Sequence, residues 1–150
     1  MRAQIDSPER FSAAAPSEIK VIILYEDFTS GTRGKNFAEC LAERLGSPCH
    51  LSESLWRCAL LASPGIAADA ARAAADCDYL ILSLRGDHDF HHATLRWIEP
   101  QLDGAAARGA AVIALVDFGG ETRGEEAWRA AGGARRHLRS MCAEKGIPFF

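Results

Sequence analysis

The sequence predicts one α/β domain of three layers: a doubly wound, five-stranded parallel sheet with helices on both faces. Three apolar segments are rich in β-branched residues and lack polar alternation, as strands buried on both faces do. Helical spacing marks the segments between the strands, and this alternation implies parallel strands joined by right-handed crossovers. The length of 150 residues suits one domain of this kind.

The first strand is predicted over residues 19–25 (IKVIILY), and a helix is predicted over residues 36–45. Between them lies a loop rich in Thr, Ser and Gly. Gly46 supplies the expected stop signal of the helix. The apolar positions expected to share one face of this helix are Phe37, Cys40, Leu41 and Leu45.

The second strand is predicted over residues 49–56 (CHLSESLW), where partial alternation favours an edge position. Residues 57–64 are expected to form a long connection. Residues 65–76 are rich in Ala, the residue with the highest helix propensity, and should be helical. The third strand, over residues 78–84 (DYLILSL), is apolar at its centre and should be buried.

The next helix is predicted from residue 93 to about 102, with a break or kink at Pro100 and residues 103–108 continuing toward the following strand. Pro100 lacks the N–H that a helix interior needs. The fourth strand is predicted over residues 110–116 (AAVIALV).

The last helix is predicted over residues 125–144, with an interruption considered at Gly132 and Gly133 and an end at Gly146. Residues 147–150 (IPFF) are short and apolar and are predicted as a fifth strand. The proline within them favours an edge position.

The compact strand order 2-1-3-4-5 places the three most apolar strands at the centre and the two weakest at the edges. Ligands of open parallel sheets bind at the carboxyl ends of the strands, near the point where the strand order reverses. That point lies between the first and third strands. Three polar, Gly-rich loops should meet there, over residues 26–35, 85–92 and 117–123.

The first of these loops precedes a helix, where free backbone N–H groups and the helix dipole favour an anion such as phosphate. A second interpretation is ordinary N-capping by Ser or Thr, with the glycines serving a turn. The loop lacks the GxxxxGK[ST] spacing of a Walker A motif. The candidate ligand-binding residues here are Thr29, Ser30, Thr32, Arg33 and Gly34.

Glu26 and Asp27 follow the first strand directly, and two carboxylates at this position would repel a phosphate unless a cation lay between them. Two roles fit them. They could hold Mg²⁺, which favours carboxylates and water, or they could pair with Arg33 or Arg85. No metal site is assigned on this basis.

The second loop carries Arg85, Gly86, Asp87 and His88, with His91 and His92 close behind. A solvated loop, a ligand-binding or acid–base role and a transition-metal site are all compatible with this cluster, although its spacing matches no metal motif. Asp117 ends the fourth strand and completes the set of candidate ligand-binding residues.

Composition excludes several other classes of protein. The net charge of −3 argues against a nucleic-acid partner that needs a broadly basic face. The four arginines at 129, 135, 136 and 139 are compatible with a local basic patch, but such spacing is also common on solvated helix faces. Five cysteines without a CxxC pair argue against zinc and for a reducing, cytoplasmic compartment. No apolar run approaches the roughly 20 residues of a membrane span.

Residues 1–17 have no apolar signal-peptide core and are expected to form a flexible tail before a domain of residues 18–150. Within that domain, the chain resembles the flavodoxin and NADPH-dependent FMN reductase superfamily. The resemblance is one of pattern, carried by the S-G-T-R-G-K-N loop, A-D-C-D-Y-L-I-L-S-L and H-A-T-L-R-W-I-E-P-Q-L. It implies a flavodoxin-like sheet and FMN as a cofactor, with the FMN phosphate in the first loop. In this chain Glu26-Asp27-Phe28 precedes that loop.

The chain is also similar to an uncharacterised bacterial flavodoxin-like group, through Y-E-D-F (residues 25–28), S-L-W (residues 54–56) and L-S-L-R-G-D (residues 82–87). Response-regulator receivers share an acidic pair after the first strand. The chain departs from them because its third strand lacks an aspartate at the phospho-acceptor position and its fifth lacks their lysine.

Two functions follow as hypotheses. The first is a small-ligand-binding domain for a nucleotide, a flavin or another phosphorylated metabolite, which as an enzyme would be a reductase or a hydrolase. The second is a non-catalytic signalling or protein-interaction module with a receiver-like fold. Core packing is the expected role of Trp56 and Trp97, and partner contact the alternative. A homodimer is compatible with both functions.

Overall fold

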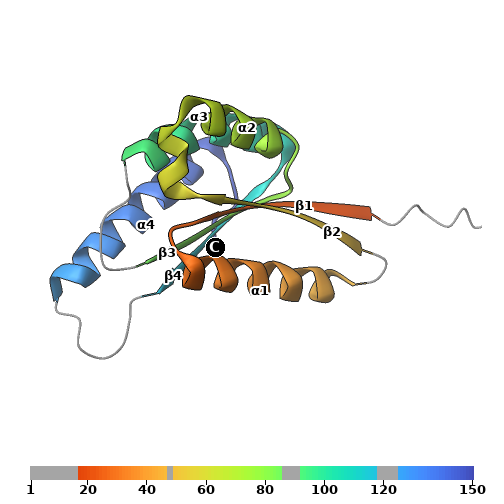
Figure 1. Cartoon of the computed structure of the whole chain (residues 1–150), viewed down its shortest axis with the longest axis horizontal. Helices are drawn as coiled ribbons and strands as arrows, with labels where there is room; N and C mark the ends of the chain where they lie inside the picture. Colours follow the sequence, from red (N-terminus) through yellow and green to blue (C-terminus); the bar gives the residue numbers. More distant parts are fainter. Residues whose placement is uncertain (1–16, 47–48, 86–91, 118–124) are drawn as a thin grey trace, which may run out of the picture.

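The computed structural model describes residues 17–46, 49–85, 92–117 and 125–150. In these parts of the chain, strands alternate with helices as predicted (Figure 1). The elements are β1 (Ser17–Tyr25), α1 (Phe28–Leu45), β2 (Cys49–Arg57), the 3₁₀ helix η1 (Cys58–Ala62), α2 (Pro64–Ala74), β3 (Tyr79–Arg85), α3 (His92–Arg108), β4 (Ala111–Asp117) and α4 (Glu125–Lys145). Apart from Ser17, the predicted tail lies outside the described residues.

The sheet contains four parallel strands in the order β2-β1-β3-β4. The described residues hold no fifth strand, and residues 147–150 make only an isolated parallel bridge, between Phe149 and Val112. The N–H of Val112 donates to the carbonyl of Pro148, and the N–H of Phe150 donates to the carbonyl of Val112. The segment therefore lies beside β4 but is too short for a regular strand, and its proline has no N–H to donate.

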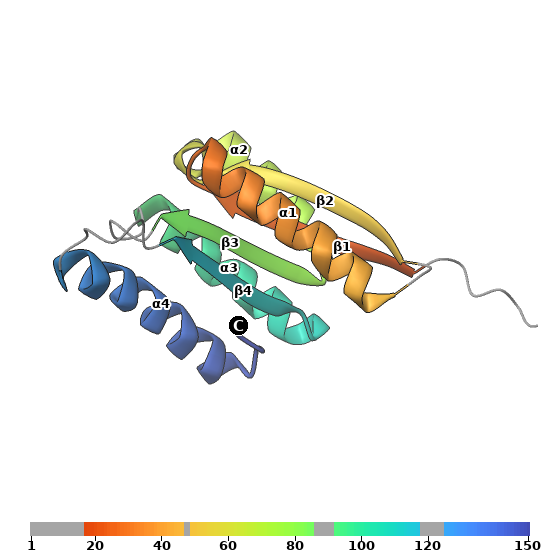
Figure 2. The ribbon, with the colours of Figure 1, turned by 90° about the horizontal axis from the view of Figure 1, so that it is seen from below.

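Helices cover the two faces of the sheet unequally (Figures 1 and 2). Among the described helices, α1 alone packs on one face, against a core that includes Val21, Ile23 and Ile81. The opposite core, which includes Leu24, Leu82 and Val112, is covered by η1, α2, α3 and the C-terminal half of α4. Successive residues of a strand point to opposite faces of the sheet, so each strand contributes side chains to both cores.

Helix α1 begins at Phe28, well before the predicted start at residue 36. The loop predicted over residues 29–34 is therefore helical. The buried face of α1 consists of small residues, Gly31, Gly34 and Ala38 among them, whereas Cys40 is exposed. The prediction that Cys40 and Leu45 lie on the apolar face was wrong. Cys40 lies two residues after the buried Ala38, about 200° around the helix, and so points away from the sheet, and Leu45 in the last turn is 48% exposed.

The later helices are longer and more regular than predicted. Helix α3 continues through Pro100, which is exposed on its outer side. The carbonyl of Arg96, which loses its helical donor there, lies on the same solvent-exposed side, where water can serve it. Helix α4 runs without interruption through Gly132 and Gly133, and Gly146 ends it with a φ of 70°. In the described part of the chain, no helix has the length and apolar character to cross a membrane.

Candidate functional site

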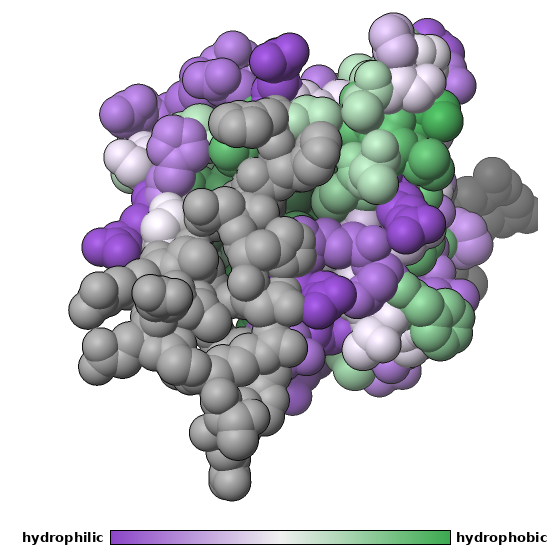
Figure 3. All heavy atoms as spheres, turned by 60° about the vertical axis from the view of Figure 1, so that its left-hand side comes forward, coloured by the Kyte–Doolittle hydropathy of each residue, from purple (hydrophilic) through white to green (hydrophobic). Residues whose placement is uncertain are grey.

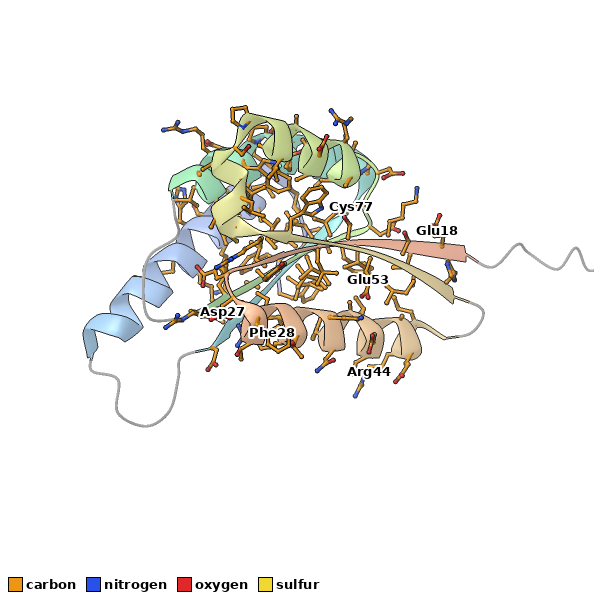
Figure 4. The ribbon with its side chains drawn as sticks, viewed as in Figure 1. Glu18, Asp27, Phe28, Arg44, Glu53 and Cys77 are labelled. Atoms are coloured by element: carbon orange, nitrogen blue, oxygen red, sulfur yellow. The ribbon has the colours of Figure 1, made fainter. Side chains whose placement is uncertain are left out.

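The candidate site lies at the carboxyl edge of the sheet, where β1, β3 and β4 end and α1 begins. Figure 3 turns this edge toward the viewer and shows hydrophilic side chains on the part of it that the structure describes. Asp27 and Phe28 mark the start of α1 there, and Glu18 and Arg44 lie at the far end of the molecule (Figure 4). Of the twelve residues predicted to bind a ligand, Gly86, Asp87 and His88 lie outside the described residues.

Asp27 and Ser30 form a capping box at the start of α1. The Asp27 carboxylate accepts the Ser30 N–H at 2.8 Å, and the Ser30 hydroxyl accepts the N–H of Asp27 at 2.9 Å. The same hydroxyl also accepts the Glu26 N–H at 3.0 Å. A carboxylate thus occupies the position where the dipole of α1 would hold an anion. A cap is present here, but the N-cap residue is Asp27 and not the Ser or Thr that the prediction named, and Ser30 is the third residue of the helix.

The capping contacts change the acidity of Asp27. Its pKa is lowered, first by the hydrogen bonds from the backbone and side chain of Ser30 and then by the nearby Arg85 and Arg33 guanidinium groups. Each of these contacts favours the charged carboxylate. Asp27 is therefore an anion at neutral pH and acts as the fixed negative group at this edge.

The two glycines of the first turns allow α1 to approach the sheet. A Cβ at Gly34 would lie 2.7 Å from Cγ2 of Ile23 and 3.3 Å from Cβ of Ser83. A Cβ at Gly31 would lie 3.0 Å from Cδ2 of Tyr25. The glycines predicted to serve a phosphate-binding turn thus serve close helix–sheet packing.

Arg33 links α1 to the ends of two strands. Its Nε donates to the Ser83 hydroxyl at 3.2 Å and its Nη2 donates to the Leu84 carbonyl at 2.7 Å, while its Nη1 lies 3.3 Å from Oδ2 of Asp117. Residues from α1, β3 and β4 therefore meet at one guanidinium group. Arg33 and Asp117, which lie far apart in sequence, are brought together as predicted.

Glu26 and Arg85 connect the ends of β1 and β3. The Glu26 carboxylate accepts the backbone N–H of Arg85, and the Glu26 carbonyl accepts from Nε of Arg57 at 3.3 Å. The Arg85 guanidinium lies 3.8 Å from Oδ2 of Asp27, with a side chain that is 47% exposed. Glu26 and Asp27 were predicted to pair with Arg33 or Arg85, and the ion pair between Asp27 and Arg85 confirms this for Asp27.

The other predicted residues of α1 take less part in this network. Thr29 and Thr32 are exposed, and the Thr32 hydroxyl donates to the Phe28 carbonyl within the helix. Among the described residues, no group of three His, Cys, Asp or Glu side chains has a metal-binding arrangement. The histidine cluster before α3 lies largely outside the described residues.

Sequence reasoning missed two features of this edge. Ser83 is fully buried beneath Arg33. The sequence feature that could have pointed to it is a single hydroxyl residue near the end of an apolar strand. Phe28 is 87% exposed beside a groove of about 210 Å³, whose other lining residues include Tyr25, Lys35 and Leu55. The groove could not be predicted from the sequence, because it is formed by the first turns of α1, which were predicted as a loop.

Trp56 and Trp97 take the core-packing role predicted for them. Trp97 is buried, and its indole N–H donates to the Ala67 carbonyl at 2.9 Å. Trp56 packs against the same core and donates to the Ser54 hydroxyl at 2.8 Å. Trp97 is buried, whereas Trp56 remains partly exposed.

The chain matches no model of a protein family, and comparison with curated proteins finds no match either.

Proposed function

We propose that this protein binds a small phosphate-bearing ligand at the carboxyl edge of its sheet, with Arg33 and Arg85 as the anion-binding groups. The observation that carries the proposal is the pair of guanidinium groups, one from α1 and one from the end of β3. They flank the ends of β1 and β3. This is the place where parallel sheets of this strand order bind ligands.

The two arginines are suited to exchange a protein carboxylate for a phosphate. Their contacts with Asp117 and Asp27, at 3.3 and 3.8 Å, are longer than the roughly 2.7–2.9 Å of a tight charge-assisted hydrogen bond. Both aspartates are more than one-third exposed. A phosphate, which carries more charge and matches the guanidinium fork, would compete well for the same donors.

A nucleotide or a flavin mononucleotide would supply such a phosphate. The resemblance to FMN reductases favours FMN, but the start of α1 does not fit the phosphate position that this resemblance implies. Asp27 caps that helix, and the Ser30 hydroxyl serves the cap. We therefore propose that the arginines, and not the α1 N-terminus, bind the phosphate.

The proposal also includes a fifth strand of the sheet and a cytoplasmic location. Residues 147–150 would act as the fifth strand of a flavodoxin-like sheet of order 2-1-3-4-5, as their bridge to β4 suggests. The cysteines whose side chains are described, Cys40, Cys58, Cys77 and Cys142, are free thiols. Free thiols are usual in a reducing compartment, which supports a cytoplasmic location.

The proposal is tested by measuring the Tm of the full chain alone and after separate addition of inorganic phosphate, ATP, FMN or Mg²⁺. A ligand at a hundred times its Kd stabilises the native state by about 2.7 kcal/mol, so at least one phosphate compound should raise the Tm by several degrees. Arg85→Gln should abolish that rise, whereas Arg139→Gln, which removes an exposed arginine of α4, should retain it. A chain whose Tm responds to no phosphate compound, or an Arg85→Gln variant that keeps the full rise, would contradict the proposal.

A protein-interaction function is the second candidate, favoured by the exposed Phe28 ring. Phe28 occupies the first position of α1, where its side chain contributes little to the core. Phe28→Asp should change the free energy of unfolding by less than about 0.5 kcal/mol, because Asp is favourable in a first helical turn. Urea unfolding measures this change. A loss above about 1 kcal/mol would show that the ring is structural and would remove the support for this second function.

A further inference from the structure

The outer edge of β2 is unpaired in the part of the chain that the structure describes. β2 is the last strand of the sheet on the side away from β4, and its pairing partner is β1 (Figure 2). With nine residues, β2 is as long as β1 and longer than β3 and β4. A long edge strand offers a row of N–H and C=O groups to which a further strand can bond.

The backbone groups at this edge belong to the odd-numbered residues of β2. The N–H of Asp78 donates to the carbonyl of Lys20 at 2.8 Å, so the even-numbered residues of β1 face β3 and the odd-numbered ones face β2. In a parallel pair, a residue bonds to the residues before and after its register partner. Ile23 therefore bonds to the neighbours of its partner Leu55, and Leu55 itself directs its N–H and C=O outward.

The side chains along this edge include exposed apolar groups beside a groove. Ile23 belongs to the core beneath α1, so its register partner Leu55 lies on the same face of the sheet. Leu55 is 39% exposed and Phe28 is 87% exposed. Together with Tyr25 and Lys35, they line the groove of about 210 Å³. A strand added beside β2 would cover part of this surface.

Two charged groups of β2 lack a matching partner among the described residues. Oε2 of Glu53 is buried and accepts no hydrogen bond, and Oε1 lies 3.7 Å from Nζ of Lys35, beyond hydrogen-bonding distance. Arg57 is exposed, and its Nε contacts the Glu26 carbonyl at 3.3 Å but no carboxylate. A buried carboxylate oxygen without a donor is unfavourable, and a guanidinium N–H is a strong donor for it.

Charge selects one register for the pairing of two copies of β2. Antiparallel pairing about a two-fold axis places odd-numbered residues opposite odd-numbered residues, on the face that carries α1. An axis through Glu53 would set its carboxylate opposite that of the other copy, which is destabilising. An axis through Leu55 sets Glu53 opposite Arg57 on both sides of the axis, and an axis through any other residue of β2 gives no pair of opposite charges. Charged residues normally protect an edge strand from pairing, and here they admit a single register.

We propose that the protein forms a dimer in which β2 pairs antiparallel with β2 of a second copy, about a two-fold axis through Leu55. Residues 53–57 form the paired segment of each strand. The Arg57 guanidinium of one copy supplies the donor that Glu53 of the other copy lacks, and the exposed Phe28 ring lies against the second copy. The paired segment is short, so the dimer is weak and reversible. The arginines proposed to bind phosphate take no part, and the proposal is independent of that function.

The test is sedimentation equilibrium of the full chain at concentrations between about 10 μM and 1 mM. The parent should show a reversible equilibrium between monomer and dimer. Arg57→Glu should weaken the dimer about tenfold or more, because it sets like charges opposite each other on both sides of the axis. Arg44→Glu reverses the charge of an exposed arginine in the last turn of α1 and should leave the equilibrium unchanged.

Glu53→Arg should weaken the dimer in the same way. An equimolar mixture of folded Glu53→Arg and Arg57→Glu chains should dimerise again, because each variant carries the charges that the other needs. No dimer of the parent, a dimer that Arg57→Glu leaves intact, or a mixture of the two folded variants that stays monomeric would overturn the proposal.

Amide hydrogen exchange of the parent tests the same register without any substitution. The N–H groups of Glu53, Leu55 and Arg57 should exchange more slowly at high than at low protein concentration, whereas the N–H of Leu60, an exposed residue of η1, should not change. Exchange of the three β2 amides that does not depend on concentration would also overturn the proposal.

Discussion

Gly34 shows how a missing side chain positions the candidate site. Without a side chain at Gly34, α1 lies close to Ile23 and Ser83 at the level of Arg33, the residue before it. A glycine in a helix interior otherwise costs about 0.5–1 kcal/mol relative to alanine. Its presence here is explained by close packing, because a Cβ would meet the side chain of a fully buried residue.

Gly34→Ala should therefore destabilise the protein by about 1–2 kcal/mol, since overpacking exceeds the gain in helix propensity. Gly133→Ala is the matched control, because a Cβ there meets nothing within 4 Å. That variant should stabilise the protein by about 0.5–1 kcal/mol. Urea unfolding of both variants measures the difference, and two shifts of the same sign would refute the packing role of Gly34.

Asp27 makes stability depend on pH. Its pKa is lower in the folded protein, chiefly because of the hydrogen bonds from Ser30, so the folded state binds this proton more weakly than the unfolded chain. The stabilisation is complete above the ordinary carboxyl range and is lost as the pH falls through the lowered pKa. Asp27→Asn keeps a good N-cap but removes the titration.

The free energy of unfolding of Asp27→Asn should consequently fall less steeply than that of the parent below about pH 4. Glu43→Gln removes a carboxylate from the same helix without touching the cap and serves as the control. The free energy of unfolding is measured at each pH by urea unfolding monitored by circular dichroism. If it depends on pH in the same way for the parent and for Asp27→Asn, the cap does not depend on this charge.

At the scale of elements, Arg33 fastens α1 to the ends of β3 and β4. Arg33→Met should cost about 1–3 kcal/mol, because it removes charge-assisted hydrogen bonds and leaves the buried Ser83 hydroxyl without this donor. Arg72→Met removes only an exposed pair with Asp69 on α2 and should cost less than about 0.5 kcal/mol. Equal costs in thermal unfolding would mean that Arg33 does not join the elements.

Pro100 interrupts the hydrogen bonding of α3 without ending the helix. Because its outer position lets water serve the freed carbonyl, the packing of Trp97, Ile98 and Leu102 maintains the helix across it. Pro100→Ala should stabilise the protein by about 1–2 kcal/mol, the gain in helix propensity exceeding the added freedom of the unfolded chain. A lower Tm for Pro100→Ala would contradict this account.

The sequence predicted some elements well and others poorly, for physical reasons. The continuous apolar runs of β1, β3 and β4 can only be buried on both faces, so their positions were predictable. The start of α1 was not, because T-S-G-T-R-G-K has the composition of a loop. In the fold, its glycines face the sheet, Ser30 serves the cap and Arg33 reaches the ends of β3 and β4, so tertiary packing overrides local propensity.

At the scale of the whole molecule, the arrangement of strands determines which predicted residues can meet. The edge position of β2 agrees with its weak hydrophobicity, whereas β4, predicted as a central strand, lies at the edge of the four-stranded sheet that the described residues form. The pairings within the site could not be predicted, because contacts such as Arg33 with Leu84 depend on the rotation of α1 about its axis. That rotation is determined by Gly31 and Gly34.

The central claim is that the carboxyl edge, through Arg33 and Arg85, binds a phosphate-bearing ligand. The most direct measurement is an amide shift titration of the full chain with whichever phosphate compound raises its Tm. The account predicts that the largest shifts occur at Glu26, Ser83, Arg85 and Asp117, and that Arg85→Gln abolishes them. Shifts concentrated on the exposed arginines of α4, at Arg135, Arg136 and Arg139, would contradict it.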